Sequence, residues 1–545
     1  MKVHKHDFTS RRPILGLVFL IFNFLIFHSQ VLSQPPTLIW QSALGGSGSD
    51  FANSIFQYGD GYLIGTVGRS NSDDGSFSNC GLSVLGDQAS VTESDSSGNY
   101  IGCLTYGGSA DDIFNCAMPV TPFGSAVHLV FLGRTLSNDY DVSGNHGQAD
   151  AWLVRTQVNG QIIHQKCIGG TGWEDAFDFL EMPDKGFLIC GVSSSDTIEG
   201  ASTNIHGGFD GWLVRTDSIG NIIWSKMYGG SSEDFLYSIC KTNDGNFVLG
   251  GFSRSNDGDV GFNNGSADYW VIKVDSAGNL LWSKTYGGSS MDYCFRVRET
   301  LDHSLVMIGY TVSYDSGFAC TQNQIGNSQD WLVKLDSTGN LLLSHCYNAD
   351  ISFARNILVT EDSCFIVASY ASSSTGDATG SGIHGCCDSW VYKVDGYGNI
   401  IWQKAFGSYG GDDSFRAIDK GTNGQYYLVG QVDQNSGDVT SFHGGDGDAW
   451  LIKIKDNALN VNIETPLREN NFQIGSLELS DLISTISEYP NSSFMVYDLL
   501  GRLELESSSS GTDLQFELTK ISSGIHLIRF TIDQKTYTLK SFKLN

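Results

Sequence analysis

The sequence is short of proline and of positive charge. Only 8 of its 545 residues are proline, against 65 glycines, which excludes a collagen-like or a proline-rich disordered chain. Lysine and arginine number 32 against 60 aspartates and glutamates, so the formal net charge is −28. Proteins bind nucleic acid largely by neutralising phosphate with Lys and Arg, and the excess of acid therefore argues against a nucleic-acid partner.

Long apolar runs are also scarce. The run ILGLVFLIFNFLIF (Ile14–Phe27) has 14 residues and follows the basic stretch MKVHKHDFTSRR. A membrane-spanning helix needs about 20 apolar residues, so this run is typical of a signal peptide, with cleavage expected before Gln34. We predict that residues 1–33 are a signal peptide, that the protein is exported by the Sec machinery, and that the mature protein has no transmembrane helix.

Cysteine is present but shows no pattern. Twelve cysteines lie between Cys80 and Cys387, and they do not recur at one position of any repeat. An oxidising compartment permits disulfides, but the spacing does not reveal the pairing. The sequence has no C-x-x-C pair, which argues against a zinc ribbon, and several cysteines are expected to be buried as small hydrophobic residues.

What the sequence does contain is a repeat. Glycine doublets begin at Gly45, Gly107, Gly169, Gly229 and Gly287, and altered copies follow at Tyr347–Asn348 and Phe406–Gly407. Tryptophans that follow an aspartate recur with nearly the same period of about 60 residues, at Trp152, Trp212, Trp270, Trp331, Trp390 and Trp450. A fixed period of this size predicts stacked supersecondary units.

Each repeat is predicted to form four strands. In one copy these are FLYSICKT, NFVLGGFS, DYWVIKVD and NLLWSKTYG, and a D-S-x-G-N turn joins the last two. Short glycine turns between alternating segments indicate β-hairpins. The fold class is therefore all-β, with a seven-bladed β-propeller over residues 34–456. A two-sheet sandwich is the alternative, but it would not require seven similar units.

The two ends of the repeat region complement each other. The mature chain begins with TLIWQSALGGSGSD, a fourth strand without its first three, and the repeat ends at DAWLIKIKD, a third strand without a fourth. We expect residues 38–44 to pair beside 449–455 and close the ring, which leaves no open sheet edge. With its recurring doublet, Asp, Trp and D-S-x-G-N turn, the region resembles the long-repeat β-propellers of secreted proteins from Gram-negative bacteria.

The C-terminal segment has a different pattern. Residues 457–471 indicate a linker, and residues 472–545 a small β-sandwich-like domain with the strand-like runs FMVYDLLGRL, DLQFELT, GIHLIRFTID and KTYTLKSFKL. This segment resembles the type A C-terminal sorting domain of type IX secretion substrates. The resemblance is carried by VYDLLGRL with Gly501, ISSGIHLIRF with Gly524, and LKSFKL with Lys540 and Lys543. An ordinary β module for binding is the alternative.

The resemblance implies a route and a destination. The protein would pass from the Sec machinery to the type IX machinery, cross the outer membrane and lose this domain at the cell surface. It would then be secreted, either extracellular or held on the outer-membrane surface.

The loops of the propeller provide the candidate sites. Strand parity places the glycine-doublet loops and the long loops between second and third strands on one face, where loops carry function more often than strands do. Five aspartates follow the doublet position at a fixed offset and are candidate binding residues: Asp50, Asp112, Asp234, Asp292 and Asp412. The alternative is that each carboxylate fixes its turn by accepting backbone N–H bonds.

Two further loop motifs allow more than one interpretation. Asp257 and Asp259 in NDGD suit a hard cation such as Ca²⁺, or they belong to a plain polar loop; no other cofactor is expected. Histidines precede glycine at His146, His206, His384 and His443, and a local His–Asp hydrogen bond suits them better than zinc.

The D-S-x-G-N turns contain a possible modification site. Ser218, Ser276 and Ser337 follow an aspartate and precede Ile, Ala and Thr, as in the O-glycosylation acceptor of some bacteria with this secretion route. The alternative is that Asp and Ser only form the turn.

No catalytic motif is recognisable. The sequence lacks a G-x-S-x-G elbow, an H-E-x-x-H motif and a phosphate-binding glycine loop. We therefore expect a secreted or cell-surface binding or adhesion protein with an extracellular protein or glycan as its ligand. A secreted hydrolase or lyase with an acidic site in the propeller channel is the alternative.

Overall fold

The computed structural model describes most of the chain. Described are residues 34–457, except for 59–62, 79, 81–85, 122–125, 200, 203–204, 315–326 and 386, and four strands beyond residue 492. The predicted signal peptide lies outside the described residues, as does all but the start of the predicted linker. The chain divides into two compact units, Met1–Asn460 and Val461–Asn545.

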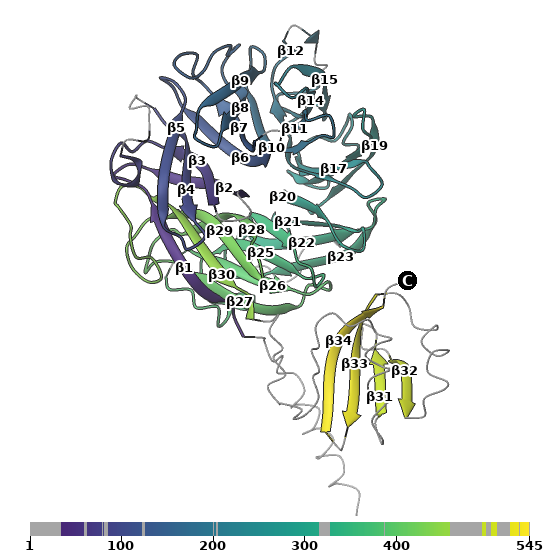
Figure 1. Ribbon diagram of the computed structural model, residues 1–545. Helices are drawn as coiled ribbons and strands as arrows, with labels where there is room; N and C mark the ends of the chain where they lie inside the picture. Colours follow the sequence, from purple (N-terminus) through teal and green to yellow (C-terminus); the bar gives the residue numbers. More distant parts are fainter. Residues whose placement is uncertain are drawn as a thin grey trace, which may run out of the picture. The chain divides into compact units, whose positions relative to one another are not determined.

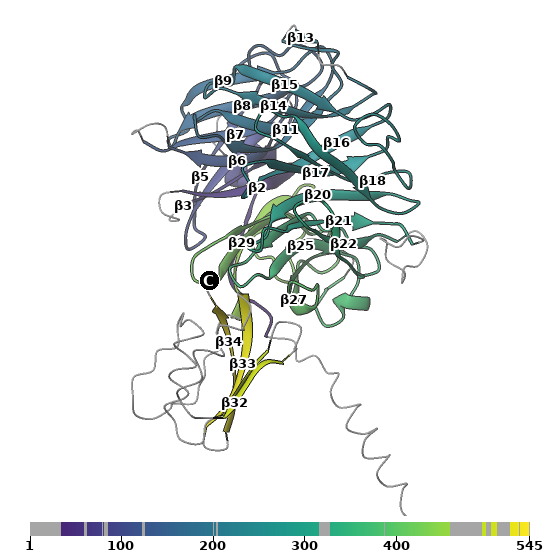
Figure 2. The ribbon, with the colours of Figure 1, turned by 90° about the vertical axis from the view of Figure 1, so that its right-hand side faces the viewer.

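The first unit is a seven-bladed β-propeller, as the repeat predicts. Seven antiparallel sheets of four strands are arranged around a central axis (Figures 1 and 2). Blade 1 comprises β2 (Asp50–Tyr58), β3 (Leu63–Ser70), β4 (Gln88–Asp95) and β5 (Tyr100–Tyr106). Blade 2 comprises β6 (Asp112–Val120), β7 (His128–Thr135), β8 (Asp150–Gln157) and β9 (Ile162–Ile168). Blade 3 comprises β10 (Glu174–Glu181), β11 (Phe187–Ser193), β14 (Asp210–Thr216) and β15 (Ile222–Tyr228).

The next three blades repeat this order. Blade 4 comprises β16 (Asp234–Lys241), β17 (Phe247–Ser253), β18 (Asp268–Val274) and β19 (Leu280–Tyr286). Blade 5 comprises β20 (Asp292–Glu299), β21 (Leu305–Thr311), β22 (Gln329–Leu335) and β23 (Leu341–Tyr347). Blade 6 comprises β24 (Asn356–Val359), β25 (Phe365–Ala371), β26 (Asp388–Val394) and β27 (Ile400–Phe406).

Blade 7 is built from both ends of the repeat region, and this confirms the predicted closure. It comprises β28 (Ser414–Lys420), β29 (Gln425–Val432), β30 (Asp448–Lys455) and the N-terminal β1 (Thr37–Leu44). Leu44 pairs with Ala449 and Thr37 with Lys455. Short elements decorate the long loops of three other blades: η1 (Gly75–Phe77), η2 (Gly376–Ala378), and the ribbon of β12 (Thr197–Ile198) and β13 (Ala201–Ser202).

The hydrogen bond of the repeated tryptophan shows how the ring is closed. In blade 4 the buried Trp270 donates from Nε1 to Ser283 Oγ at 2.9 Å, 13 residues further along the chain. The same bond with the same separation recurs in blades 2, 3, 5 and 6. In blade 7 Trp450 donates instead to Gln41 Oε1 at 2.9 Å, so β1 takes the place of the missing fourth strand.

The core lies between neighbouring blades, because both faces of each sheet are buried. Trp270 and Ile272 pack against Leu213 of blade 3. Val271, on the opposite face of the same strand, packs with Trp331 of blade 5. A single blade would expose both faces, which is why the unit recurs.

The second unit contains one described sheet. β31 (Ser493–Tyr497), β32 (Leu503–Ser508), β33 (Gly524–Ile532) and β34 (Lys535–Lys543) pair in the order β32-β31-β33-β34. A second layer, which the sandwich-like prediction requires, would have to come from residues outside those described. Among the described residues of both units, no helix is long and apolar enough to cross a membrane.

Candidate functional site

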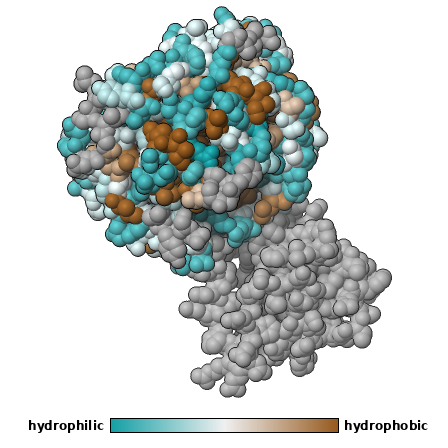
Figure 3. All heavy atoms as spheres, turned by 45° about the horizontal axis from the view of Figure 1, so that its top comes forward, coloured by the Kyte–Doolittle hydropathy of each residue, from teal (hydrophilic) through white to brown (hydrophobic). Residues whose placement is uncertain are grey.

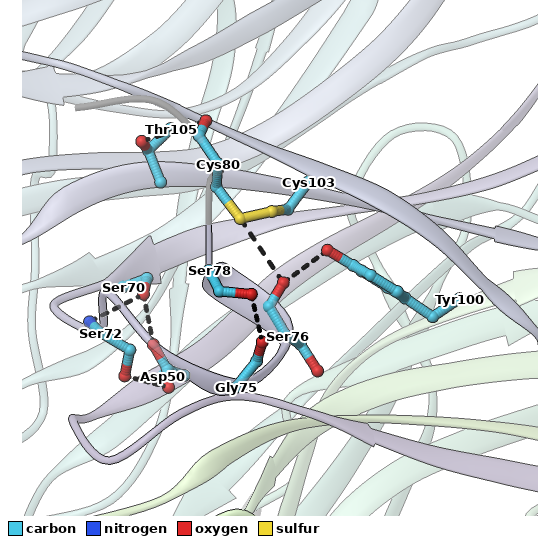
Figure 4. The surroundings of a disulfide bond; sticks show 10 residues. All are labelled: Asp50, Ser70, Ser72, Gly75, Ser76, Ser78, Cys80, Tyr100, Cys103 and Thr105. Carbon is cyan, nitrogen blue, oxygen red and sulfur yellow. Dashed lines mark hydrogen bonds between the residues drawn. A yellow bond between two sulfur atoms is a disulfide. The ribbon is translucent and has the colours of Figure 1, made fainter. Parts of the chain in front are cut away.

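The aspartates after the glycine doublets are buried at the start of the innermost strands. Asp234 is 0% exposed, and its Oδ2 accepts the Gly230 N–H at 2.7 Å and the Ser255 hydroxyl at 2.8 Å. Burial raises its pKa, which the hydrogen bonds lower in part. Asp50, Asp112 and Asp292 accept the corresponding N–H from Gly46, Gly108 and Gly288. Figure 4 shows Asp50 beside Ser70 and Ser72, which both donate to it.

Asp412 does not belong to this set. The equivalent position in blade 7 is Asp413, whose Oδ2 accepts the Ser408 N–H at 2.5 Å. In blade 3 the position is taken by Glu174, which accepts the Gly170 N–H at 2.7 Å. The constant offset expected from the sequence therefore fails at Asp412, because the blade 7 turn is one residue longer. The Asp412 side chain is exposed.

A second set of aspartates lies at the start of the third strands and contacts the histidines. His146 Nδ1 lies 2.6 Å from Asp150 Oδ2, and His443 Nδ1 lies 2.8 Å from Asp448 Oδ2. His206 and His384 lie 3.2 Å from Asp210 and Asp388 in the same way. These contacts are local to each blade, and each histidine also donates its backbone N–H to the same carboxylate.

Asp257 and Asp259 bind the neighbouring turn through backbone groups. Asp257 Oδ1 accepts the Ser231 N–H at 2.7 Å, and Asp259 donates its own N–H to the Gly229 carbonyl at 2.9 Å. Among the described residues, no group of three or more His, Cys, Asp or Glu side chains is placed to hold a metal ion. Calcium binding at this loop stays a prediction.

The D-S-x-G-N turns lie at the opposite ends of the strands. In one of them Asp275 Oδ1 accepts the N–H groups of Ala277 and Asn279 at 2.9 and 2.8 Å. Gly278 has a φ of +75°, a left-handed conformation that favours glycine. The aspartates therefore form the turns, while Ser276 and Ser337 are exposed and Ser218 is half-buried. O-glycosylation at these three serines stays a prediction.

The sorting residues can be placed only by strand register. Gly524 is the first residue of β33 and pairs with Lys543, and Lys540 pairs with Leu527. Gly501 lies outside the described residues, between β31 and β32, which pair as antiparallel neighbours.

One disulfide attaches a long loop to the outer strand of its own blade. Cys80 in the long loop of blade 1 is bonded to Cys103 in β5 (Figure 4). Cys346 and Cys387 each take part in a disulfide bond as well. Six further cysteines are buried: Cys116, Cys167, Cys190, Cys240, Cys294 and Cys364. The expectation of buried, hydrophobic cysteines is confirmed for these six.

The central channel is lined by a feature that the sequence analysis missed, a bulge in the innermost strands. The register of β16 shifts between Leu236 and Ser238, so Tyr237 is unpaired in the ladder. β2, β6, β10, β20 and β28 shift at the equivalent point. The bulged residues, with Arg355 of blade 6, form what we call the bulge ring: Asn53, Asn115, Phe177, Tyr237, Phe295, Arg355 and Arg416.

Several neighbouring members of the bulge ring are in contact. Phe177, Tyr237 and Phe295 are in ring contact, with centroids 4.8 and 5.4 Å apart. Arg355 lies 4.6 Å from the Phe295 centroid, and Arg416 donates to Asn53 Oδ1 at 3.0 Å. Asn115, which follows Asn53 in the ring, donates to Asp175 Oδ1 at 2.8 Å. The ring is thus aromatic in blades 3 to 5 and polar or cationic in the other four.

A cavity opens above the bulge ring at the long-loop face. This mouth cavity has a volume of about 390 Å³. It is lined by residues of blades 6 and 7: Phe353, Arg355, Tyr370, Asp412, Ser414, Arg416, Gln431, Asp433 and Asp446. A smaller cavity of about 170 Å³ lies within the channel, lined by residues from six inner strands, and includes the Asp178–Arg296 ion pair of 3.0 Å.

An aromatic belt leads to the mouth cavity from blades 4 and 5. Phe252 and Tyr293 meet edge to face with centroids 4.1 Å apart, and Tyr293 contacts Tyr310 at 5.2 Å. Tyr310 in turn contacts Phe353 at 4.8 Å, and Phe353 contacts Tyr370 at 6.0 Å. Four of these five rings are half-buried, which leaves part of each ring exposed. The hydrophobic residues visible in Figure 3 lie in small patches among hydrophilic ones.

Comparison with known proteins supports no function. The chain matches no protein-family model, and no curated protein matches it in sequence. A crystal structure of puromycin hydrolase is similar over 74% of this chain and 54% of its own, with 12% identity and a TM-score of 0.40. Raptor of Chaetomium thermophilum is similar over 82% of this chain and 33% of its own, with 9% identity and a TM-score of 0.40.

A third structure is similarly distant. Hydrazine synthase of Kuenenia stuttgartiensis is similar over 71% of this chain and 77% of its own, with 10% identity and a TM-score of 0.35. Thus the chain spans about a third of the Raptor chain and about half of the puromycin hydrolase chain. The molecule is a β-propeller by its own sheets, and its function has to be argued from its own residues.

Proposed function

We propose that this protein is a glycan-binding protein and that the mouth cavity is its binding site. The observation that carries the proposal is the combination of half-buried aromatic rings with polar side chains in one cavity on the loop face. Phe353 and Tyr370 offer ring faces on which a sugar can lie, and Asp412, Gln431 and Asp433 offer groups for its hydroxyls. Ligand sites typically combine such apolar walls with a few oriented polar groups.

One observation bears on the alternative that the protein is an enzyme. A tyrosine and an acid lie together in the cavity, because Tyr370 and Asp412 both line it. Burial and the Asp412 carboxylate raise the pKa of Tyr370 to about 12. The phenol therefore stays protonated near neutral pH. A general base needs a pKa near the working pH, so Tyr370 does not suit that role. This pair supports binding better than hydrolysis or elimination.

Export completes the proposal. The signal-peptide pattern of residues 1–33 and the sorting-domain resemblance of residues 472–545 support delivery to the cell surface or the medium by the Sec and type IX machineries. A glycan ligand is consistent with that location, since the ligand would be met outside the cell.

The test is binding of the mature protein to a glycan array, followed by affinity measurement of any ligand found. Phe353→Ala and Tyr370→Ala should each lower the affinity about 5- to 10-fold, because a stacking contact contributes roughly 1 kcal/mol. The matched control is Tyr397→Ala, since Tyr397 is 40% exposed in a D-G-Y-G-N turn at the opposite end of the strands. Chromogenic glycosides should not be turned over.

Two results would contradict the proposal. One is the absence of binding to any saccharide, and the other is binding that Phe353→Ala and Tyr370→Ala leave unchanged. Turnover of a glycoside that these variants abolish would establish the enzyme alternative instead.

A further inference from the structure

Two arginines in the mouth cavity have no acidic partner, although the protein carries 60 acidic residues against 32 basic ones. Arg355 and Arg416 both line the cavity, and among the described residues no carboxylate lies within ion-pair distance of either guanidinium. Three arginines of other blades are paired. Arg69 meets Asp87, Arg134 lies 2.5 Å from Asp175, and Arg254 lies 2.8 Å from Glu233.

Aromatic rings hold both guanidinium groups in place. Arg355 lies over Phe295 at 4.6 Å from the ring centroid, and Arg416 lies over Phe51 at 4.4 Å. Arg416 also donates from one terminal nitrogen to Asn53 Oδ1 at 3.0 Å. Stacking of this kind fixes the plane of a guanidinium while leaving other N–H donors available.

The two charges also disfavour each other. Burial lowers the pKa of Arg416 to about 10, and the neighbouring Arg355 and Arg69 add to this effect. Burial likewise lowers the pKa of Arg355. A planar anion placed between the two guanidinium groups would relieve this repulsion and accept hydrogen bonds from both.

We infer that the glycan bound in the mouth cavity is acidic, and that its carboxylate or sulfate group is held by Arg355 and Arg416. This inference rests on the proposed glycan-binding function. The sugar ring would lie against Phe353 and Tyr370, which line the same cavity as the two arginines.

The rest of the cavity lining sets a limit on the charge of the ligand. Asp412, Asp433 and Asp446 line the same cavity and would repel anionic groups placed near them. The site therefore selects a saccharide with a single anionic group inserted beside the arginines over a dense polyanion such as a nucleic acid.

The experiment compares three oligosaccharide probes on the mature protein. The first is a galacto-oligosaccharide that carries one galacturonate residue, the second is the same oligosaccharide with that carboxylate reduced to a neutral alcohol, and the third is the same oligosaccharide with one sulfate group in place of the carboxylate. Preference for the first or the third over the neutral probe, by about tenfold or more, is the expected result. The two acidic probes distinguish a carboxylate ligand from a sulfate ligand.

Variants assign the preference to the two arginines. Arg355→Gln and Arg416→Gln should each remove it, lowering the affinity for the acidic probe about tenfold or more while leaving the neutral probe unchanged. Arg355→Lys should recover only part of it, because an ammonium cannot offer the planar pair of donors. Lys284→Gln is the charge-matched control, since Lys284 lies on the outermost strand of blade 4 and donates to Asn340. Thermal unfolding of each variant checks that it folds.

The outcomes separate this inference from the function on which it rests. Equal binding of acidic and neutral probes, or a preference that survives both glutamine variants, overturns the inference and leaves glycan binding in place. Failure of every saccharide on the array overturns the proposed function and the inference with it.

Discussion

The first glycine of each doublet is required by the two carboxylates beside it. A Cβ built on Gly287 would lie 2.6 Å from both Asp268 Oδ1 and Asp292 Oδ2. Gly169, Gly229 and Gly407 are enclosed in the same way by one acid from the first strand and one from the third. The repeat Gly-Gly-x-x-x-acid and the repeat Asp-x-Trp, which are separate in the sequence, therefore form one packed cluster at each of these junctions between neighbouring blades.

Gly287→Ala should destabilise the propeller by about 1–3 kcal/mol, because the added methyl group has no space beside the two buried carboxylates. Denaturant unfolding measures the effect. Gly102→Ala is the control, since a Cβ at Gly102 would meet nothing within 4 Å. Equal stability of the two variants would contradict the account of the doublet.

The same cluster makes stability depend on pH. Asp268 is 0% exposed, and its Oδ1 has no hydrogen-bond partner among the residues that the structure describes. Burial raises the pKa of Asp268 from 3.8 to about 7, and the neighbouring Asp292 contributes. A carboxyl that binds its proton more tightly in the folded state stabilises the fold below its unfolded pKa, and this stabilisation is lost as the pH rises through the folded pKa.

The free energy of unfolding should therefore fall between pH 4 and pH 7 through this group, by an amount on the order of 2–4 kcal/mol. Asp268→Asn keeps the shape of the neutral carboxyl and removes the titration, so its unfolding free energy should fall less over this range. Chemical denaturation at a series of pH values measures both proteins. A variant with the same pH profile as the unmodified protein would show that Asp268 does not titrate in this way.

At the scale of elements, neighbouring blades are joined by hydrogen bonds from the fourth strand to the next blade's turn. Tyr286, at the end of β19, donates its hydroxyl to the Gly339 carbonyl at 2.6 Å. Tyr106, Tyr228 and Tyr347 donate to Gly160, Gly278 and Gly398 in the same way. The tyrosine before the glycine doublet is thus an interblade contact, and it reaches the glycine of the turn that follows the next blade's third strand.

Deletion of residues 34–46 should open the ring and destabilise it. The deletion removes β1, exposes the edge of β30 and leaves the Trp450 indole without its Gln41 acceptor. We expect a fall in Tm on the order of 10 °C together with aggregation through the new edge. Differential scanning calorimetry and light scattering measure the two effects.

Truncation after residue 460 is the control for this deletion, because it falls at the boundary of the two compact units. The Tm of the propeller should then be unchanged. A β1 deletion as stable as this control would show that the N-terminal strand does not hold the ring closed.

At the scale of the whole molecule, the distribution of charge bears on the proposed function. The formal net charge is −28, whereas Arg355 and Arg416, which form no ion pair with any described residue, line the cavity where blades 6 and 7 meet. The propeller supplies a rigid ring, and the loops of one face supply the cavity. The second unit is separate from this arrangement and is predicted to serve export.

Truncation after about residue 465 should trap the protein in the periplasm of its native host, since the sorting resemblance lies beyond that point. Cell fractionation and surface proteolysis measure the distribution. The unmodified protein should reach the surface and lose the C-terminal domain there, which intact-mass measurement can detect. Normal surface delivery of the truncated chain would exclude a sorting role for these residues.

The sequence by itself determined the class of fold and its closure. The period of about 60 residues, the four alternating segments and the two incomplete ends predict the seven blades, because each is a local or periodic pattern. For the candidate site, the sequence predicts only the face of the propeller on which it lies, and not the residues that line it. The offset from the doublet predicts Asp412 at the turn, whereas the structure places Asp412 in the mouth cavity and Asp413 at the turn.

The tertiary structure alone decided which side chains meet in the channel. Six inner strands contribute one bulged residue each, and blade 6 contributes Arg355 just before β24. The residues that meet lie about 60 positions apart, as Arg355 and Arg416 do. The bulge depends on how β16 and its equivalents pair with the second strands, which the spacing of residues does not reveal. The repeats agree where blades pack on blades, because every blade meets the same neighbours. They differ at the bulge because only one strand of each blade faces the channel, and there seven side chains of four kinds form a single asymmetric lining.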